Sequence, residues 1–208
     1  MKVILINGSP HERGCTYTAL SEVARGMTDH GVDAEIIHIG TYDIPGCRGC
    51  FACRKLGKCV IDDGVNEIAE KLKVADGMVI GSPVYFASPS GSLISFLDRL
   101  YAAHGNSLMY KPCGCIVSAR RAGTTAALEA LHKYPMVNEQ PLISSSYWCM
   151  VHGNAPDEVR KDTEGMEIAY NLGRNMAWMV KALGDMTYTT DPADYVQMEL
   201  TPLAQWTQ

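Results

Sequence analysis

The sequence predicts an α/β fold in which one parallel sheet is covered by helices on both faces. Short apolar runs rich in Val and Ile alternate with stretches whose apolar residues recur at helical spacing. This alternation is typical of consecutive strand–helix units. Polar, glycine-containing loops follow several of the apolar runs. Because ligands bind beyond the C-terminal ends of the strands in such sheets, these loops are expected to form the ligand site.

The first unit begins with residues 2–7, an apolar β-branched run that is typical of a strand buried on both faces. A polar loop follows over residues 8–16, and helical spacing continues to Met27. Free N–H groups at a helix start bind anions, and the hydroxyls of Ser9 and Thr16 can add donors. The loop has neither the Walker sequence nor G-x-G-x-x-G. We therefore expect a phosphate site here, with a helix merely capped by Thr16 as the alternative.

Residues 33–39 are predicted to be the second strand and residues 77–82 the third. Between them, a helix is expected to begin near Asp62 and Asp63, which are good capping residues. The loop after the third strand, residues 83–91, carries two aromatic residues where a polar surface loop would be expected. The third helix is marked by apolar residues at 93, 96, 97 and 100, and Asp98 and Arg99 near its end are interpreted as a structural ion pair.

Residues 113–118 are predicted to be the fourth strand, residues 119–124 a polar loop, and residues 124–132 a helix. A short fifth strand (residues 142–145) and a long helix (about 157–183) complete the pattern. The 208 residues suit a single α/β domain. We expect that domain to span residues 1–185, and the polar residues 186–208 to form a C-terminal tail that packs on the body or reaches a neighbour.

The composition narrows the class of protein. A formal net charge of −5 leaves no basic surface for nucleic acid. The first apolar run is too short for a signal peptide, and no run reaches membrane-spanning length. Eight cysteines in such a chain suggest a reducing compartment, where clustered thiols bind metal or do redox chemistry more often than they form disulfides. We expect a cytoplasmic protein with no nucleic acid or membrane partner.

Four cysteines fall within one loop, residues 45–63, at spacing C-x2-C-x2-C-x5-C. Three thiolates at this spacing with a fourth nearby are how ferredoxin-like loops hold an iron–sulfur cubane. Zinc ribbons usually split their ligands into two separated C-x2-C pairs. A [4Fe–4S] cluster is therefore the leading interpretation, with zinc or metal-free reduced thiols as alternatives. The ligands would be Cys47, Cys50, Cys53 and Cys59.

The sequence gives less indication of a function for the other cysteines. Cys113 and Cys115 share a face of a buried strand and are expected to be core thiols, and Cys149 beside Trp148 is expected to be packing. Cys15 would lie at a helix N-terminus, where the helix dipole lowers a thiol pKa.

Three loops thus follow strands: residues 8–16 offer anion donors, 83–91 aromatic rings, and 119–124 hydroxyls and guanidiniums. Together they suit a flat aromatic ligand that carries a phosphate. The segments NGSPHERGCT (7–16), GSPVYF (81–86) and GSLISFLDR (91–99) resemble the flavodoxin-like NADPH-dependent FMN reductases. With the four-cysteine loop and the Asp pair after it, the chain is similar to the iron–sulfur flavoprotein branch of that family.

The resemblance covers about residues 1–183 and implies a flavodoxin-like three-layer sandwich, a five-stranded sheet in the order 2-1-3-4-5, bound FMN, and a homodimer or homotetramer. Three departures from the family pattern are His11 for Arg, Cys15 for Asn, and Ile94 for Lys; Arg13 can replace the missing cation. The implied phosphate contacts are Ser9, His11, Gly14, Cys15 and Thr16. Pro83, Val84, Tyr85 and Phe86 would line the isoalloxazine, and Ser118, Arg120 and Gly123 would close its other edge.

The function predicted in this way is that of an FMN-dependent oxidoreductase whose cluster exchanges electrons with the flavin. No catalytic protein residue is expected, because the flavin does the chemistry. The expected electron donor is NAD(P)H or another small-molecule or protein carrier, and the acceptor is a small molecule or a protein. The cysteine loop follows the second strand, so flavin and cluster are expected to be close, in one subunit or across an interface. The alternatives are a cluster-free NAD(P)H-dependent FMN, quinone or nitro reductase and, less favoured, a non-enzymatic metal- or redox-sensing module.

Overall fold

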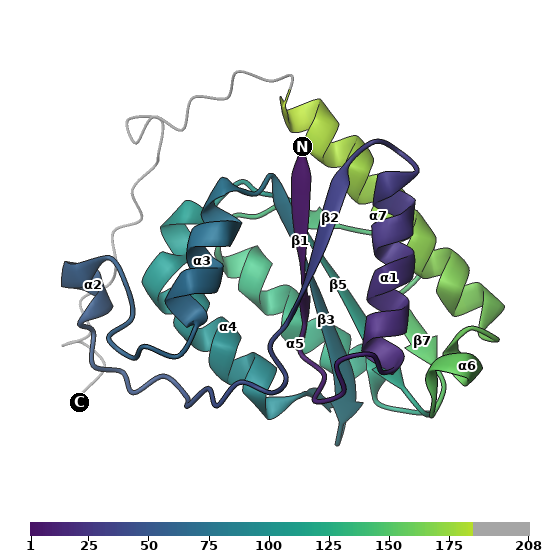
Figure 1. The fold of residues 1–208 in the computed structure, drawn as a ribbon, viewed down its shortest axis with the longest axis horizontal. Helices are drawn as coiled ribbons and strands as arrows, with labels where there is room; N and C mark the ends of the chain where they lie inside the picture. The colour runs from purple at the N-terminus through teal and green to yellow at the C-terminus, as the bar shows by residue number, and fades with distance from the viewer. Residues whose placement is uncertain (185–208) are drawn as a thin grey trace, which may run out of the picture.

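The computed structural model describes residues 1–184 and has the predicted three-layer arrangement of helix, parallel sheet and helix (Figure 1). The main strands run in the order β2-β1-β3-β5-β6, and every neighbouring pair is parallel. This confirms the flavodoxin-like order 2-1-3-4-5, with β5 and β6 as the fourth and fifth strands. The bounds are β1 (Lys2–Asn7), β2 (Asp33–His38), β3 (Gly77–Tyr85), β5 (Cys113–Ala119) and β6 (Leu142–Ile143).

Two further strands were not predicted. β4 (Ser88–Pro89) pairs antiparallel with the end of β3 and makes a hairpin of the loop at residues 83–91. β7 (Met150–His152) pairs with β5, as β6 does, but β6 lies beside Cys113 and β7 beside Val117. The strand beyond β5 is therefore made in two pieces, separated by residues 144–149.

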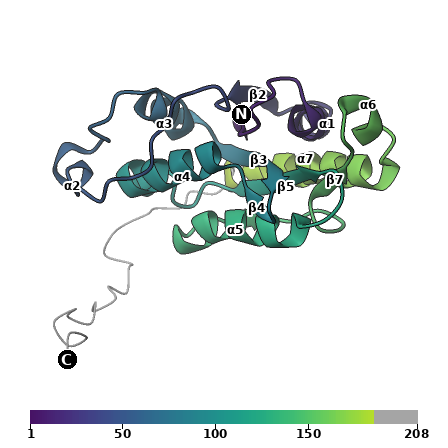
Figure 2. The same ribbon diagram turned by 90° about the horizontal axis from the view of Figure 1, so that it is seen from below.

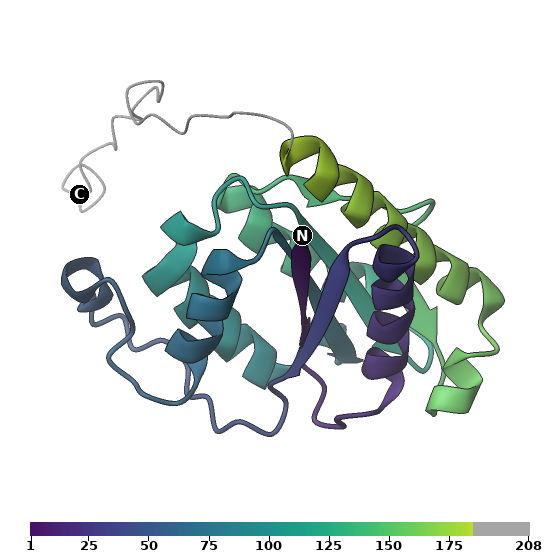
Figure 3. The same cartoon turned by 45° about the horizontal axis from the view of Figure 1, so that its top comes forward.

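Helices cover both faces of the sheet. α1 and α7 lie side by side on one face, and α3, α4 and α5 lie on the other (Figures 1 and 3). Two glycines allow the close approach of α1 and α7: a Cβ at Gly26 would lie 2.2 Å from the Tyr170 carbonyl oxygen, and one at Gly173 would lie 2.0 Å from that of Val23. The bounds are α1 (Cys15–Thr28), α3 (Val65–Val74), α4 (Gly91–His104), α5 (Thr124–Val137) and α7 (Thr163–Gly184), with a short 3₁₀ turn η1 (Gly105–Ser107) after α4.

Two helix predictions need correction, and one helical turn was not predicted. The long last helix is broken into α6 (Pro156–Val159) and α7, because the Asp162 carboxylate accepts the N–H groups of Gly165 at 3.0 Å and His152 at 2.7 Å. α5 continues past His132 to Val137 with Pro135 inside it. The cysteine loop contains a single helical turn, α2 (Cys53–Leu56), that the sequence did not predict.

The start of α3 also differs from the prediction. The helix begins at Val65, after Gly64 at φ +92°, and no side chain among the described residues caps it. Asp63, expected as a cap, instead binds the guanidinium of Arg99. A carboxylate that could satisfy a helix end is thus used to neutralise a buried cation.

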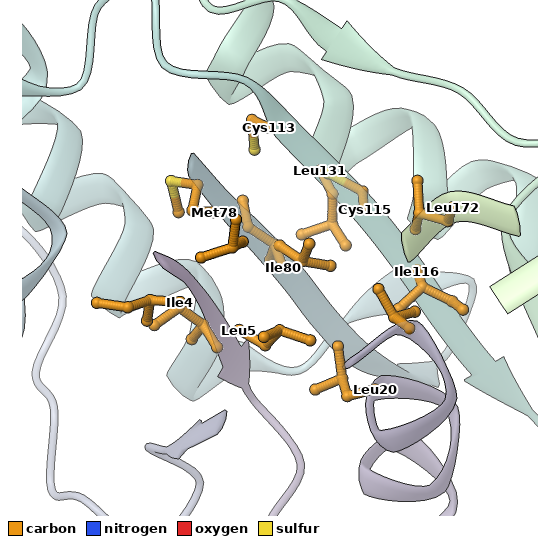
Figure 4. Packing of buried hydrophobic residues seen from close by; sticks show 14 of the residues in the cluster. Ile4, Leu5, Leu20, Met78, Ile80, Cys113, Cys115, Ile116, Leu131 and Leu172 are labelled. Carbon is orange, nitrogen blue, oxygen red and sulfur yellow. The ribbon is translucent and has the colours of Figure 1, made fainter. Parts of the chain in front are cut away.

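The core lies between the sheet and its helices (Figure 4). Ile4, Ile80 and Ile116 of adjacent strands are at most 1% exposed, and Leu20 and Leu172 from the helices are fully buried. Burial of each such side chain contributes about 1.5–3 kcal/mol relative to exposure. Within residues 1–184, no helix is both long and apolar enough to cross a membrane. The tail predicted for residues 186–208 lies outside the described residues.

Candidate functional site

The loop between β1 and α1 is shaped by Asn7, a fully buried residue that the sequence-based prediction missed. Its Oδ1 accepts the Ser9 N–H at 3.1 Å, and its Nδ2 donates to the Glu12 carbonyl at 2.9 Å. Ser9 Oγ in turn accepts the His11 N–H at 3.2 Å. A buried asparagine at the end of an apolar strand was the available signal, since a buried amide needs local partners.

The start of α1 is left free of a side-chain cap. Its N-cap residue is Gly14, and no side chain among the described residues makes a capping hydrogen bond there. Thr16 is not the cap, so that alternative is wrong: its hydroxyl bonds Ser118 Oγ at 2.8 Å instead. The first N–H groups of a helix have no intrahelical acceptor, so this end of α1 fits the phosphate of a bound nucleotide.

Contacts between the loops bring the three predicted segments together. The Thr16–Ser118 bond joins the α1 loop to β5. A Cβ at Gly123 (φ +91°) would lie 2.8 Å from Ala87 Cα, so the loop after β5 touches the β3–β4 hairpin. Ser90 Oγ donates to the Gly8 carbonyl at 2.7 Å, which ties the hairpin to the first loop. The three loops, residues 8–16, 83–91 and 119–124, therefore form one edge, which we call the flavin edge after the ligand that the family resemblance predicts.

The tip of the hairpin is strained and apolar. Tyr85 pairs with Ser88, and the two turn residues, Phe86 and Ala87, have φ values of 51° and 61°. Such backbone costs about 1–3 kcal/mol per residue and is found mostly at functional sites. The hairpin holds the Phe86 ring fully in solvent, at 106% relative exposure, and leaves Tyr85 45% exposed. Two rings presented at this edge fit a flat aromatic ligand.

The polar groups predicted around the phosphate and the far edge of the isoalloxazine differ in their surroundings. His11, Arg13 and Arg120 are exposed, and the Arg13 guanidinium lies 5.9 Å from the Tyr17 ring centre. The Cys15 thiol donates to the Gly153 carbonyl at 3.6 Å. Burial raises the pKa of Cys15, with Glu158 adding to the rise. A hydrogen bond from the backbone of Cys15 lowers the pKa, but loss of solvent outweighs it, so the lowering expected at the helix N-terminus is wrong.

The remaining cysteines outside the loop are core thiols, as predicted. Cys113 and Cys115 are 0% and 1% exposed, and Cys149 is 5% exposed. Burial raises the pKa of the Cys149 thiol to about 12. A thiol with its pKa raised in this way stays protonated and is a poor nucleophile.

The four loop cysteines line one pocket beside α4, which we call the cysteine pocket. Cys47 and Cys50 are exposed, Cys53 and Cys59 are partly buried, and Cys53 Sγ donates to the Ala102 carbonyl at 3.4 Å. Among residues 1–184, no three His, Cys, Asp or Glu side chains converge as a single metal ion would require. The four thiols thus line the wall of one pocket but do not surround a common point. The other residues that line this pocket are Arg48, Phe51, Val60, Ile61, Arg99, Ala102 and Ala103.

The predicted ion pair between Asp98 and Arg99 is wrong, because Arg99, in the wall of this pocket, binds a different carboxylate. Arg99 is 1% exposed, and its guanidinium binds both carboxylate oxygens of Asp63. Asp98 instead accepts the Tyr134 hydroxyl at 2.6 Å. Adjacent residues on a helix point in different directions, whereas Asp63 lies within hydrogen-bond distance of the Arg99 guanidinium.

The two sites lie at opposite ends of α4. Ser90, just before α4, bonds into the flavin edge, whereas Ala102 and Ala103 near its C-terminal end line the cysteine pocket. At about 1.5 Å per residue, the helix separates them by roughly 17 Å. Figures 1 and 2 show α2 outside the sheet, on the side of α3 and α4. Within one subunit, the four cysteines therefore do not lie beside residues 8–16 as expected, because the chain turns away after β2.

Comparisons with known proteins agree with this architecture. A family model described as NADPH-dependent FMN reductase matches residues 1–155. An iron–sulfur flavoprotein of Methanocaldococcus jannaschii is 32% identical over 191 residues, covering 88% of this chain and 99% of that protein. Another, of Archaeoglobus fulgidus, is 32% identical over 201 residues, covering 90% and 97%. The crystal structure of RosB with bound 8-demethyl-8-formylriboflavin-5′-phosphate matches with a TM-score of 0.74 at 15% identity, covering 92% of this chain and 83% of that one, which shows a shared fold.

Proposed function

This chain belongs to the NADPH-dependent FMN reductase family and is a flavin-dependent oxidoreductase, and we propose that it carries a [4Fe–4S] cluster that exchanges electrons with FMN. The proposed cluster ligands are Cys47, Cys50, Cys53 and Cys59. The single observation that carries the proposal is that all four thiols line one pocket. Their spacing, and two relatives named iron–sulfur flavoproteins, also support it.

The backbone of Cys59, one of the proposed ligands, is held in place by side-chain hydrogen bonds. The Asn66 side chain accepts its backbone N–H at 2.9 Å and donates to its carbonyl at 2.9 Å. His104 Nε2 bonds Asn66 Oδ1 at 2.9 Å and so holds the amide in place. A ligand whose backbone is fixed before the cluster arrives loses less conformational entropy on binding.

At the flavin edge, the protein supplies binding and orientation, while bound FMN supplies the hydride and electron chemistry. The free first turn of α1, with Ser9 beside it, is proposed to hold the phosphate. The hairpin rings are proposed to cover the flavin and exclude water from it. The full proposed set is Ser9, His11, Gly14, Cys15, Thr16, Pro83, Val84, Tyr85, Phe86, Ser118, Arg120 and Gly123.

NADPH is the proposed donor, in line with the family description, and the acceptor is a small molecule or a protein. A homodimer or homotetramer is also proposed. The exposed Tyr147 and Trp148, whose rings pack 4.9 Å apart, offer apolar surface for a subunit contact. Light scattering of the purified protein would test this assembly, and a monomer would contradict it.

A cluster-free reductase is the second candidate. In it the four thiols, of which Cys47 and Cys50 are exposed, stay reduced and free of metal. It shares the flavin edge and predicts flavin without iron.

Anaerobic purification followed by a visible spectrum and assays of iron and acid-labile sulfide separates the two candidates. The proposal expects flavin together with about four irons per chain. Cys59→Ala should lose iron and keep flavin. Lys58→Ala, which changes an exposed neighbour in the same loop, should keep both. Flavin with neither iron nor sulfide in the wild-type protein would refute the cluster.

A further inference from the structure

Arg99 is a buried cation in the wall of the cysteine pocket, with only 1% of its surface exposed. It belongs to α4, whereas most of its contacts belong to the cysteine loop. Nη1 donates to Asp63 and to the Pro45 carbonyl at 3.4 Å. Nη2 donates to Asp63 at 2.8 Å and to the Ile61 carbonyl at 3.1 Å. Because Pro45 precedes the first cysteine and Ile61 follows the last, one guanidinium joins both ends of the loop.

The fifth N–H of Arg99 is directed at a thiol. A guanidinium has five N–H donors in a fixed plane. The Asp63 carboxylate and the two carbonyls accept hydrogen bonds from the four N–H groups on Nη1 and Nη2. Nε donates to Cys59 Sγ at 3.4 Å. Asp63 spans the two terminal nitrogens, so it neutralises the guanidinium from the end away from Cys59. The sulfur therefore faces the positive end of an N–H dipole whose direction is fixed by the other four bonds.

We propose that Arg99 is a positioning residue of the cysteine pocket: it fixes Cys59 as a ligand and raises the reduction potential of the cluster bound there. This inference rests on the proposed function. Hydrogen bonds to the sulfurs and nearby charge set the potential of an iron–sulfur cluster. Reduction adds negative charge. The fixed N–H dipole stabilises the more negative state, and the guanidinium balances the Asp63 carboxylate, which would otherwise oppose it. Residues that orient metal ligands in this way commonly change metal affinity 10- to 100-fold when replaced.

The test compares holoproteins purified without air, each matched for flavin content and circular dichroism. Arg99→Gln removes the charge and the planar fork. Arg99→Lys keeps the charge but cannot make five directed bonds. Arg54→Gln is the matched control, because Arg54 lies in the same loop but is exposed and stacked 4.6 Å from the Phe51 ring centre. The readouts are the rate of iron release to a chelator and the cluster potential from a redox titration.

We expect Arg99→Gln to release iron roughly 10- to 100-fold faster and to have a lower potential than the wild type. Arg99→Lys should also release iron faster but keep a potential nearer the wild type, and Arg54→Gln should match the wild type in both. If Arg99→Gln does not fold, the Lys variant decides through both readouts: faster iron release with a potential below that of the wild type supports the inference, and an unchanged potential overturns it. A purely structural role would leave the potential unchanged in every variant that keeps its iron, and that result would overturn the inference.

Two other results would also overturn it. An equal shift of potential in Arg54→Gln would mean that any nearby charge acts, without a directed bond. A wild-type protein without iron or sulfide would remove both this inference and the proposed cluster, whereas an iron-loaded wild type with an unaffected Arg99→Gln would remove this inference alone.

Discussion

The flavin edge and the cysteine pocket are built in different ways. The flavin edge draws on residues 8–16, 83–91 and 119–124, at the ends of three buried strands, and hydrogen bonds such as Ser90–Gly8 join one loop to another. The cysteine pocket takes its thiols from residues 47–59 alone, and the loop is held to α4 chiefly through Arg99. The sheet therefore positions the first site, whereas one buried ion pair positions the second. Substitutions should affect one region and spare the other.

The largest expected effect is at the anchor of the cysteine pocket. Arg99→Met leaves the Asp63 carboxylate without its partner, and such breaks cost about 3–5 kcal/mol of unfolding free energy. Arg160→Met is the matched control, since both side chains of its ion pair with Asp157 are exposed. Loss of this pair should cost less than about 1 kcal/mol. Urea unfolding of the purified proteins measures both. Equal losses in the two variants would mean that Arg99 is not an anchor.

Asn7→Ala tests the flavin edge. It removes the side chain that holds both Ser9 and Glu12, and a broken buried hydrogen bond costs about 1–3 kcal/mol. Flavin content should fall while iron content per folded chain is kept. Asn175→Ala, whose amide bonds the Ser144 carbonyl on the surface, should change neither. Loss of iron together with flavin would show that the two regions are not independent.

Phe86→Ala separates binding from stability within the flavin edge. The ring is fully exposed, so the unfolding free energy should change by no more than about 0.5 kcal/mol. Loss of an aromatic contact of about 0.5–1.5 kcal/mol should weaken FMN binding about 2- to 12-fold, measured by fluorescence titration of the flavin-free protein. Unchanged affinity would place the flavin away from the hairpin tip.

The smallest expected effect is on pH dependence near the cysteine pocket. Burial lowers the pKa of His104, with Lys73 adding to the fall and Glu70 opposing it. Below pH 6.5, the ordinary pKa of this histidine, the unfolded chain binds more protons than the folded one. The contribution of His104 to stability is therefore complete above that pH and falls as the pH drops. His104→Gln should flatten this fall, leaving the part that belongs to His132, whose pKa burial also lowers. Unfolding curves at several pH values test this, and an unchanged slope would contradict it.

Much of the flavin edge could be predicted from the sequence, because strand, loop and helix follow each other locally. The run from residue 2 to residue 7 and the helical spacing after it predicted β1, its loop and α1. The β3–β4 hairpin was missed, because two residues of pairing leave no periodic pattern. β7 was missed for the same reason, as it is only three residues long.

The sequence by itself determined the parallel sheet, its strand order through the family resemblance, the three loops of the flavin edge, and the spacing of the four cysteines. These features depend on short-range patterns of apolar, glycine and cysteine residues. Tertiary structure alone decided that Asp63 pairs with Arg99, that Thr16 bonds Ser118, and that the cysteine loop lies at the far end of α4. The physical reason is that a side chain with several polar neighbours binds whichever acceptor the packed chain brings within about 3 Å, and sequence separation carries no information about that distance.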